Sequence, residues 1–171
     1  MKSDSLEETV QDLWEAIVNT YFPWDENYRN KSKGTNQQNN TAPDVKMIQI
    51  MAKYANTNPR VAGDWAERQI LQVECKRPSL DNARYGWDDV ITGQFLDDLF
   101  MNLNASKRTY GVVAIGKKGK FFRFDGKKAA AEPDALVALY SGKIDLGDET
   151  QFPQFAYWMD YIKRNGYQWA Y

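Results

Sequence analysis

Apolar and polar side chains alternate in residues 68–76, which read Arg-Gln-Ile-Leu-Gln-Val-Glu-Cys-Lys. From Leu71 onward every second residue is apolar, and Pro78 ends the pattern. Successive side chains of a β-strand point to opposite faces of its sheet. The segment is therefore predicted to be a strand that presents Glu74 and Lys76 side by side on one face and apolar side chains on the other.

Three further segments carry apolar residues at the 3.6-residue spacing of an amphipathic helix. They cover residues 5–21, 87–104 and 155–164. Ser5 opens a capping-box pattern at the first helix, and Gly166 is expected to end the last one. Short apolar runs predict strands at 45–51, 110–115 and 120–124, the last two as a hairpin, and a short strand or helix at 136–141.

Residues 25–41 are polar and rich in Asn and Gln, so a flexible surface loop is predicted there. Helices and strands otherwise follow one another along the chain. This order predicts an α/β (α+β) fold, with a central mixed β-sheet flanked by helices. The length of 171 residues is typical of one domain, and residues 1–171 are predicted to form a single domain.

The amino-acid composition excludes several classes of protein. No apolar run is long enough to span a membrane, and the polar start of the chain predicts no signal peptide. A single cysteine, Cys75, cannot form an intrachain disulfide. An intracellular location, in the cytoplasm or the nucleus, is therefore expected, with no membrane partner.

The chain contains no histidine. Its absence excludes Ser-His-Asp and Cys-His catalysis, histidine metal sites and nucleases that use a histidine base. Any hydrolytic chemistry must use carboxylates, lysines, hydroxyl groups and a hard metal cation.

Positive charge is concentrated in residues 106–128, although the whole chain has a net charge of −1. This stretch holds one acidic residue, Asp125, and eight basic ones: Lys107, Arg108, Lys117, Lys118, Lys120, Arg123, Lys127 and Lys128. A local basic surface on a neutral protein is typical of a site for nucleic-acid phosphates. The alternative is a hairpin whose lysines protect its solvent-exposed edge.

Two carboxylates and a lysine stand where a phosphodiesterase would need them. A divalent cation offsets the charge that develops during hydrolysis and lowers the pKa of the attacking water, and Mg²⁺ takes oxygen ligands. Asp44 opens one predicted strand, while Glu74 and Lys76 share one face of the next. The alternative is an ordinary ion pair of Glu74 and Lys76 on the surface of the sheet.

Pro43-Asp44 followed by Glu74-Cys75-Lys76 resembles the motif of the PD-(D/E)XK, or restriction-endonuclease-like, nuclease superfamily. The resemblance covers roughly residues 5–125 and extends to the order of the elements. It implies a restriction-endonuclease-like core and a metal-dependent hydrolase. Asp44, Glu74 and the Cys75 carbonyl would bind Mg²⁺ or Mn²⁺, and Lys76 would be the catalytic lysine.

Two more site residues are implied by this resemblance, which places a glutamine on the second helix and a glutamate on the first. Gln94 follows Trp87 by seven residues and Val90 by four, so it is predicted to share their inward-facing stripe. A helix-edge glutamine bonded to the backbone is its alternative role. Glu7 is the candidate on the first helix, because it lies at the margin of the apolar stripe.

The sequence thus favours a nuclease that acts on DNA, with RNA not excluded, and that holds backbone phosphates through Lys117, Lys118 and Lys120. The alternative is a catalytically inactive nuclease-fold module that binds nucleic acid or a protein partner. Lys46, two residues after Asp44, could neutralise the metal site in such a module.

Three further features of the sequence concern a long gap in the motif, the aromatic residues near the end of the sequence, and a resemblance of residues 161–169. The long gap between Asp44 and Glu74 implies an insertion around residues 53–66. The aromatic residues of the tail, Tyr167, Trp169 and Tyr171, are expected to pack on the sheet or to contact a partner, which includes a second copy of the chain. Residues 161–169 resemble the ends of fungal nuclease-like proteins.

Overall fold

The computed structural model describes residues 7–34, 46–55 and 65–171. Its described residues form a mixed sheet of seven strands flanked by helices, an α+β arrangement. The strands are β1 (Tyr28–Gly34), β2 (Lys46–Ala55), β3 (Trp65–Lys76), β4 (Arg108–Ile115), β5 (Lys118–Asp125), β6 (Leu136–Ala138) and β7 (Ile144–Asp145). Their order is β1-β2-β3-β4-β5, and both β6 and β7 pair with the free edge of β5. The predicted mixed sheet is confirmed.

All neighbouring strands are antiparallel except β3 and β4, which are parallel. A parallel pair needs a crossover connection, because the chain must return to the same end of the sheet. Four short helical segments supply it: η2 (Pro78–Asn82), α2 (Gly86–Val90), η3 (Ile91–Phe95) and α3 (Leu96–Phe100). The crossover therefore brings one helical layer over the face of the sheet that carries Glu74.

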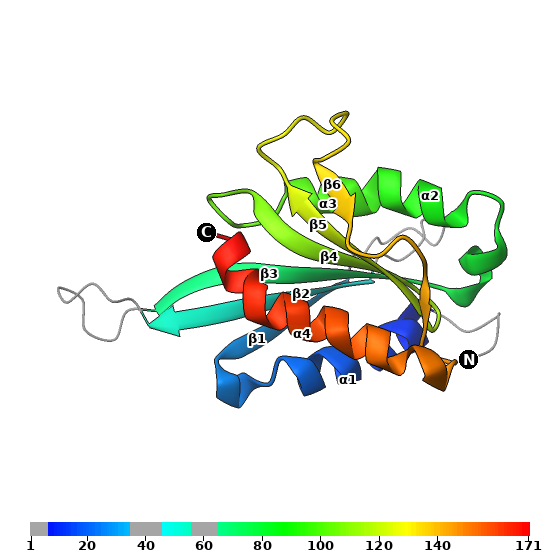
Figure 1. Cartoon of the computed structure of the whole chain (residues 1–171), viewed down its shortest axis with the longest axis horizontal. Helices are drawn as coiled ribbons and strands as arrows, with labels where there is room; N and C mark the ends of the chain where they lie inside the picture. Colours follow the sequence, from blue (N-terminus) through cyan, green and yellow to red (C-terminus); the bar gives the residue numbers. More distant parts are fainter. Residues whose placement is uncertain (1–6, 35–45, 56–64) are drawn as a thin grey trace.

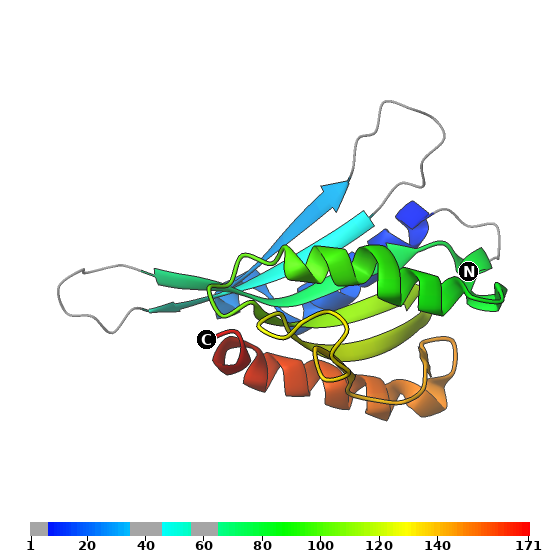
Figure 2. The same cartoon turned by 90° about the horizontal axis from the view of Figure 1, so that it is seen from above.

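Helices cover both faces of the sheet (Figure 1). Helices α1 (Glu7–Tyr21) and α4 (Phe152–Trp169) pack on one face, together with the short segment η1 (Trp24–Glu26) near β1 and η4 (Glu149–Gln151) before α4. The α2–α3 segment runs across the other face, as the view from above shows (Figure 2). Each face has its own apolar core. Trp14, Ile48, Val73 and Phe121 belong to the first core, and Trp87, Phe95, Val113 and Phe124 to the second.

A β-bulge in β3 decides which side chains face each core. Ile50 of β2 is in register with Leu71 and Met51 is in register with Gln69, so Ile70 has no partner in β2. Ile70 and Leu71 both lie in the α1/α4 core. The extra residue keeps Gln69 on the same face as Glu74, because a bulge shifts the side-chain alternation by one position.

The loop predicted for residues 25–41 is wrong in its first half. Tyr28–Gly34 form β1, which pairs with β2 along its whole length, and residues 35–41 lie outside the described part of the chain. An edge strand is held by backbone hydrogen bonds to one neighbour. It therefore needs no apolar alternation, which is the pattern that was missing from the sequence.

The last helix does not end at Gly166. It runs from Phe152 to Trp169, and Gly166 is buried inside it. A Cβ at this position would lie 2.9 Å from the Cβ of Ile70, so the glycine allows α4 to approach the bulge of β3 closely. The glycine here serves packing between helix and sheet, and it is not a terminator.

The second helix is also not continuous as predicted. Ile91–Phe95 form a π-helical segment in which Gly93 has φ −96° and ψ −118°. A π segment adds one residue to a turn and shifts the buried stripe by one position. Phe95 is therefore buried in the place expected for Gln94, and the Gln94 side chain is exposed. The inward orientation predicted for Gln94 is wrong.

The remaining elements agree with the sequence. Strands β4 and β5 form the predicted hairpin, joined by Gly116 and Lys117, and the segment at 136–141 contains a strand. The capping position expected at Ser5 lies outside the described residues. No helix in residues 7–34, 46–55 or 65–171 is long and apolar enough to cross a membrane.

Candidate active site

Glu74 and Lys76 point to the same face of β3, as the alternation predicts. The Glu74 side chain is fully buried, and that of Lys76 is 6% exposed. Lys76 Nζ lies 3.2 Å from Glu74 Oε1. The pair is therefore no surface ion pair, because the α2–α3 layer lies over this face and the pair is shielded from water. Carboxylates and lysines are rarely buried to this extent.

Two more carboxylates act on Glu74. Burial is the largest influence on Glu74 and raises the pKa of its carboxyl group to about 7, although Lys76 opposes this effect. Asp98 of α3 and Glu7 at the start of α1 raise the pKa further through charge repulsion. Such repulsion requires short separations. The fold thus brings Glu7 near Glu74, together with Asp98, which the sequence reasoning missed, and the site role of Glu7 stays a prediction.

Asp98 has a signal in the sequence that could have identified it. It lies three residues after Phe95 and next to Leu99, at the margin of the buried stripe, and it is half-buried. The same argument selected Glu7 on the first helix. The sequence reasoning missed Asp98 because the π-helical segment at Ile91–Phe95 shifts the buried stripe by one residue. A regular 3.6-residue spacing that starts at Trp87 therefore does not lead to residue 98.

The carboxylate oxygens of Glu74 can accept more hydrogen bonds than the described residues give them. Neither Oε1 nor Oε2 receives a well-directed hydrogen bond from any described residue, and Lys76 approaches Oε1 alone. A buried carboxylate oxygen without a donor is costly. A hard divalent cation bound at Oε2 would remove this cost, so the carboxylates at this position fit the Mg²⁺ or Mn²⁺ that the sequence motif implies.

The other expected ligands are described only in part. Asp44 lies outside the described residues, and so does the side chain of Lys46, whose backbone is in register with Cys75. Cys75 is a residue of β3, the strand between β2 and β4, and its side chain is buried in the α1/α4 core. Burial raises the pKa of its thiol well above the usual value, so the thiol stays protonated. Its carbonyl remains a predicted ligand.

No three acidic or cysteine residues gather closely enough to hold a cation by themselves in the parts of the chain that the structure describes. Glu7 and Asp98 are each near enough to raise the pKa of Glu74, but the three residues do not form a closed ligand set. Gln94, which the resemblance implied as a site residue, is exposed. Its side chain makes no hydrogen bond or ion pair with the described residues of the site, and its role stays a prediction.

A strip of buried glutamines continues the polar face of β3 away from Glu74. Gln49, Gln69 and Gln72 are each less than 4% exposed, and their amides are linked by hydrogen bonds of 3.3 Å. Asn104 fixes the end of this strip, since its side chain bonds both the backbone N–H and the carbonyl of Gln69. The sequence reasoning missed the strip, because the bulge at Ile70 interrupts the alternation.

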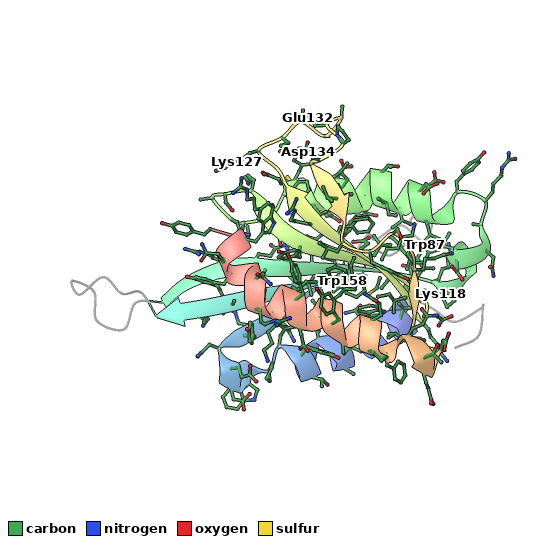
Figure 3. All side chains as sticks on the ribbon, in the orientation of Figure 1. Trp87, Lys118, Lys127, Glu132, Asp134 and Trp158 are labelled. Carbon is green, nitrogen blue, oxygen red and sulfur yellow. The ribbon has the colours of Figure 1, made fainter. Side chains whose placement is uncertain are left out.

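The basic residues do not form one continuous surface. The hairpin separates them into a group at its turn and a group at its open end, and eight strand residues span about 25 Å. Figure 3 labels Lys118 at the turn and Lys127 at the other end. The prediction of a single basic surface from residues 106–128 is wrong, because antiparallel strands place the two ends of the stretch apart.

The turn group is the one near Glu74. Glu74 is in register with Val113 of β4, which is in register with Lys120 of β5, so two strand spacings of about 5 Å separate Glu74 from Lys120. The amide of Gly116, which precedes Lys117, donates to the Lys76 carbonyl. The turn of the hairpin therefore lies at the end of β3 where the candidate site is.

Much of the positive charge at the turn is already paired. Lys118 Nζ lies 2.6 Å from Asp81 Oδ2, and Lys143 and the indole N–H of Trp87 donate to Asp81 Oδ1. Burial alone would raise the pKa of Asp81, but these hydrogen bonds outweigh it and lower the pKa to about 2. Lys118 is thus held by a carboxylate, while Lys117 is exposed and Lys120 lies over the Trp87 ring.

The chain was compared with known proteins at the levels of sequence family and structure. No protein-family model, curated protein or solved structure matches it. What the site can do chemically is therefore decided by its own side chains.

Proposed function

We propose that this protein is a metal-dependent nuclease that hydrolyses phosphodiester bonds, with DNA favoured over RNA as substrate. The observation that carries the proposal is the fully buried Glu74 carboxylate, with Lys76 at 3.2 Å and an oxygen that accepts no hydrogen bond from any residue the structure describes. A protein that needed Glu74 only for stability would gain from an apolar residue there. Retaining this charge in the interior is typical of a functional site.

Glu74, with Glu7 or Asp98 and the predicted ligand Asp44, would hold Mg²⁺ or Mn²⁺. When bound, such a cation supplies charge neutralisation and a more acidic water molecule. Glu7 and Asp98 each repel the Glu74 carboxylate, so the site has excess negative charge that a divalent cation would neutralise.

Lys76 has a separate role in this proposal. Its ammonium group is held beside Glu74 by the alternation of β3, and it can donate hydrogen bonds to an attacking water or to a phosphate oxygen. Its buried position fixes the direction of the donors before substrate binds. Lys117 and Lys120 lie at the turn beside this end of β3, where they would contact the backbone phosphates next to the cleaved bond.

The order of the elements supports a restriction-endonuclease-like core as part of the proposal. Helix α1 precedes β2 and β3, the α2–α3 crossover follows, and β4 then pairs in parallel with β3. Asp44 precedes the first residue of β2 by two positions in the sequence, and Glu74 and Lys76 lie on β3. This is the order of helix, strand with aspartate, strand with Glu-x-Lys, helix and strand that the sequence resemblance implies.

A panel of substrates tests the proposal. Supercoiled plasmid, single-stranded DNA, duplex DNA and structured RNA would be incubated with wild type in Mg²⁺, Mn²⁺ or EDTA. Lys76→Ala and the matched control Lys127→Ala, an exposed lysine at the far end of the hairpin, would be purified identically. We expect cutting that needs metal, persists in Lys127→Ala and is lost in Lys76→Ala.

A second candidate is a nuclease-fold module that binds without cutting. The direct approach of Lys76 to Glu74 favours it, because this ion pair partly neutralises the carboxylate in the absence of metal. The module would bind nucleic acid or a protein partner. Folded wild type that cuts no substrate under any metal condition, yet binds DNA in a salt-sensitive manner, would replace the first candidate by this one.

A further inference from the structure

The buried glutamines beside Glu74 form a chain of hydrogen bonds that runs in one direction. Gln49 Nε2 donates to Gln69 Oε1, and Gln69 Nε2 donates to Gln72 Oε1, each at 3.3 Å. Asn104 bonds the backbone of Gln69 and so fixes the middle of the chain. Gln49 Oε1 and Gln72 Nε2 are buried, and neither has a hydrogen-bond partner among the described residues. The chain therefore begins at a free acceptor and ends at a free donor.

The donor end of the chain is the end next to Glu74. Gln72 and Glu74 are two residues apart on β3, so their side chains share one face, with about 7 Å between their Cα atoms. Gln72 Oε1 is bonded to Gln69, and the planar amide then directs Nε2 away from Gln69. Reversing all three amides would present an oxygen to the ionised Glu74 carboxylate, which only accepts hydrogen bonds. The direction of the chain thus suits the carboxylate.

Gln72 Nε2 and the Glu74 carboxylate form no direct hydrogen bond. One water molecule can join a donor and an acceptor at this spacing, and a buried water needs roughly two to four polar partners. Three buried atoms offer them: Gln72 Nε2 as donor, and a Glu74 oxygen and Gln49 Oε1 as acceptors. Gln49 lies opposite Gln72 in the register of β2 and β3. A water at this position would accept one hydrogen bond and donate two, which matches its capacity.

We propose that Gln72 is a positioning residue for Glu74, and that it holds the carboxylate through one buried water molecule shared with Gln49. The inference rests on the proposed function, because it assigns Gln72 to the orientation of a metal ligand. An ionised carboxylate can accept about four hydrogen bonds. Lys76 approaches one oxygen of Glu74 and the water would take one further position, so acceptor positions remain for a cation.

A high-resolution crystal structure of the full chain in EDTA tests the water site without metal, substrate or turnover. We expect an ordered water within about 3.2 Å of Gln72 Nε2, Gln49 Oε1 and one Glu74 oxygen. Crystals of Gln72→Met, which keeps the length of the side chain and removes the amide, should lack this water. A wild-type structure with no ordered water between Gln72 and Glu74 would overturn the proposal.

Mn²⁺ binding, measured by isothermal titration calorimetry, tests the positioning role. Groups that orient a metal ligand are worth about 10- to 100-fold in metal affinity or activity. Gln72→Met should therefore raise the Kd for Mn²⁺ about 10-fold or more, and should lower kcat for DNA while KM stays within about twofold.

Thr109→Val is the matched control for a loss of stability. Thr109 is fully buried and its hydroxyl donates to the Gln69 carbonyl, so the variant loses a buried hydrogen bond at the far end of the glutamine chain. Urea denaturation should show that Thr109→Val and Gln72→Met are both folded and both less stable than wild type. Thr109→Val should nevertheless keep the wild-type Kd for Mn²⁺. Equal weakening of Mn²⁺ binding in the two variants would refute the positioning role.

The same measurements separate this role from the nuclease proposal. If wild type cuts DNA and folded Gln72→Met binds Mn²⁺ at the wild-type Kd, the positioning role is refuted and the nuclease stands. If wild type binds Mn²⁺ but cuts no substrate, while Gln72→Met binds Mn²⁺ about 10-fold more weakly, the nuclease is refuted and the positioning role is supported. A wild type that binds no Mn²⁺ would refute both.

Discussion

At the scale of single residues, burial separates groups that the sequence alone treats alike. Glu74 and Asp81 are both acidic residues near basic partners, yet their pKa values move in opposite directions. Glu74 has one lysine and two repelling carboxylates around a fully buried side chain. Asp81 receives three hydrogen bonds and remains partly open to water. The first arrangement is suited to binding a cation, and the second to holding loops together.

Asp81→Asn tests the structural role of the second group. The folded-state pKa of Asp81 is lowered to about 2 from 3.8, so its stabilising effect is fully present above pH 4 and is lost as the pH falls towards 2. We expect Asp81→Asn to lower the free energy of unfolding by about 1–2 kcal/mol at pH 7 and to flatten the loss of stability between pH 4 and pH 2. Urea denaturation at several pH values measures both. A variant with the wild-type pH dependence would contradict this role.

At the scale of elements, three of the sequence predictions failed for reasons that involve neighbours. Position 166 of α4 needs a glycine because Ile70 lies against the helix there. The bulge that places Ile70 depends in turn on the pairing of β2 with β3. The stripe of the second helix shifts at Gly93. Strand β1 exists because β2 offers it an edge. None of these can be read from local periodicity, whereas the strand that carries Glu74 could be, because its alternation is local.

Gly166→Ala tests the contact of α4 with β3. The added Cβ would meet the backbone-attached Cβ of Ile70 at 2.9 Å, and a branch point cannot rotate away. We expect a loss of about 1–3 kcal/mol in the free energy of unfolding, although alanine favours helix. Gln168→Ala, at an exposed position of the same helix, should change it by less than about 0.5 kcal/mol. Equal stability of the two variants would show that α4 adjusts its position.

At the scale of the whole molecule, the hairpin distributes charge in a manner that a linear count conceals. The count of residues 106–128 correctly indicated many cations, but the fold sends them to two ends of β4 and β5. Of the two ends, the turn is the one beside Lys76, because the Gly116 amide at the turn donates to the Lys76 carbonyl. Val113, which is in register with Glu74, lies two residues before the end of β4 at this turn. The position of the candidate site could be predicted from Glu74 and Lys76, whereas its electrostatic surroundings required the three-dimensional fold.

Charge reversal at the two ends of the hairpin distinguishes their roles. Lys117→Glu combined with Lys120→Glu should weaken binding to a labelled DNA duplex about 10-fold or more in EDTA, and should reduce its salt dependence. Lys127→Glu, at the far end, should leave the Kd within about twofold of wild type. Fluorescence anisotropy at several salt concentrations measures both effects. Equal effects of reversal at the two ends would contradict a binding surface confined to the turn.

We propose that metal-dependent phosphodiester hydrolysis by this protein requires the buried Glu74 carboxylate. The most direct test is single-turnover cleavage of DNA in Mg²⁺ or Mn²⁺ by wild type, Glu74→Gln and Glu149→Gln. Gln keeps the shape of the side chain but removes its charge, and Glu149 is an exposed control. We expect wild type and Glu149→Gln to cut equally and Glu74→Gln to be slower by about 100-fold or more. Cleavage by folded Glu74→Gln at the wild-type rate would contradict the claim.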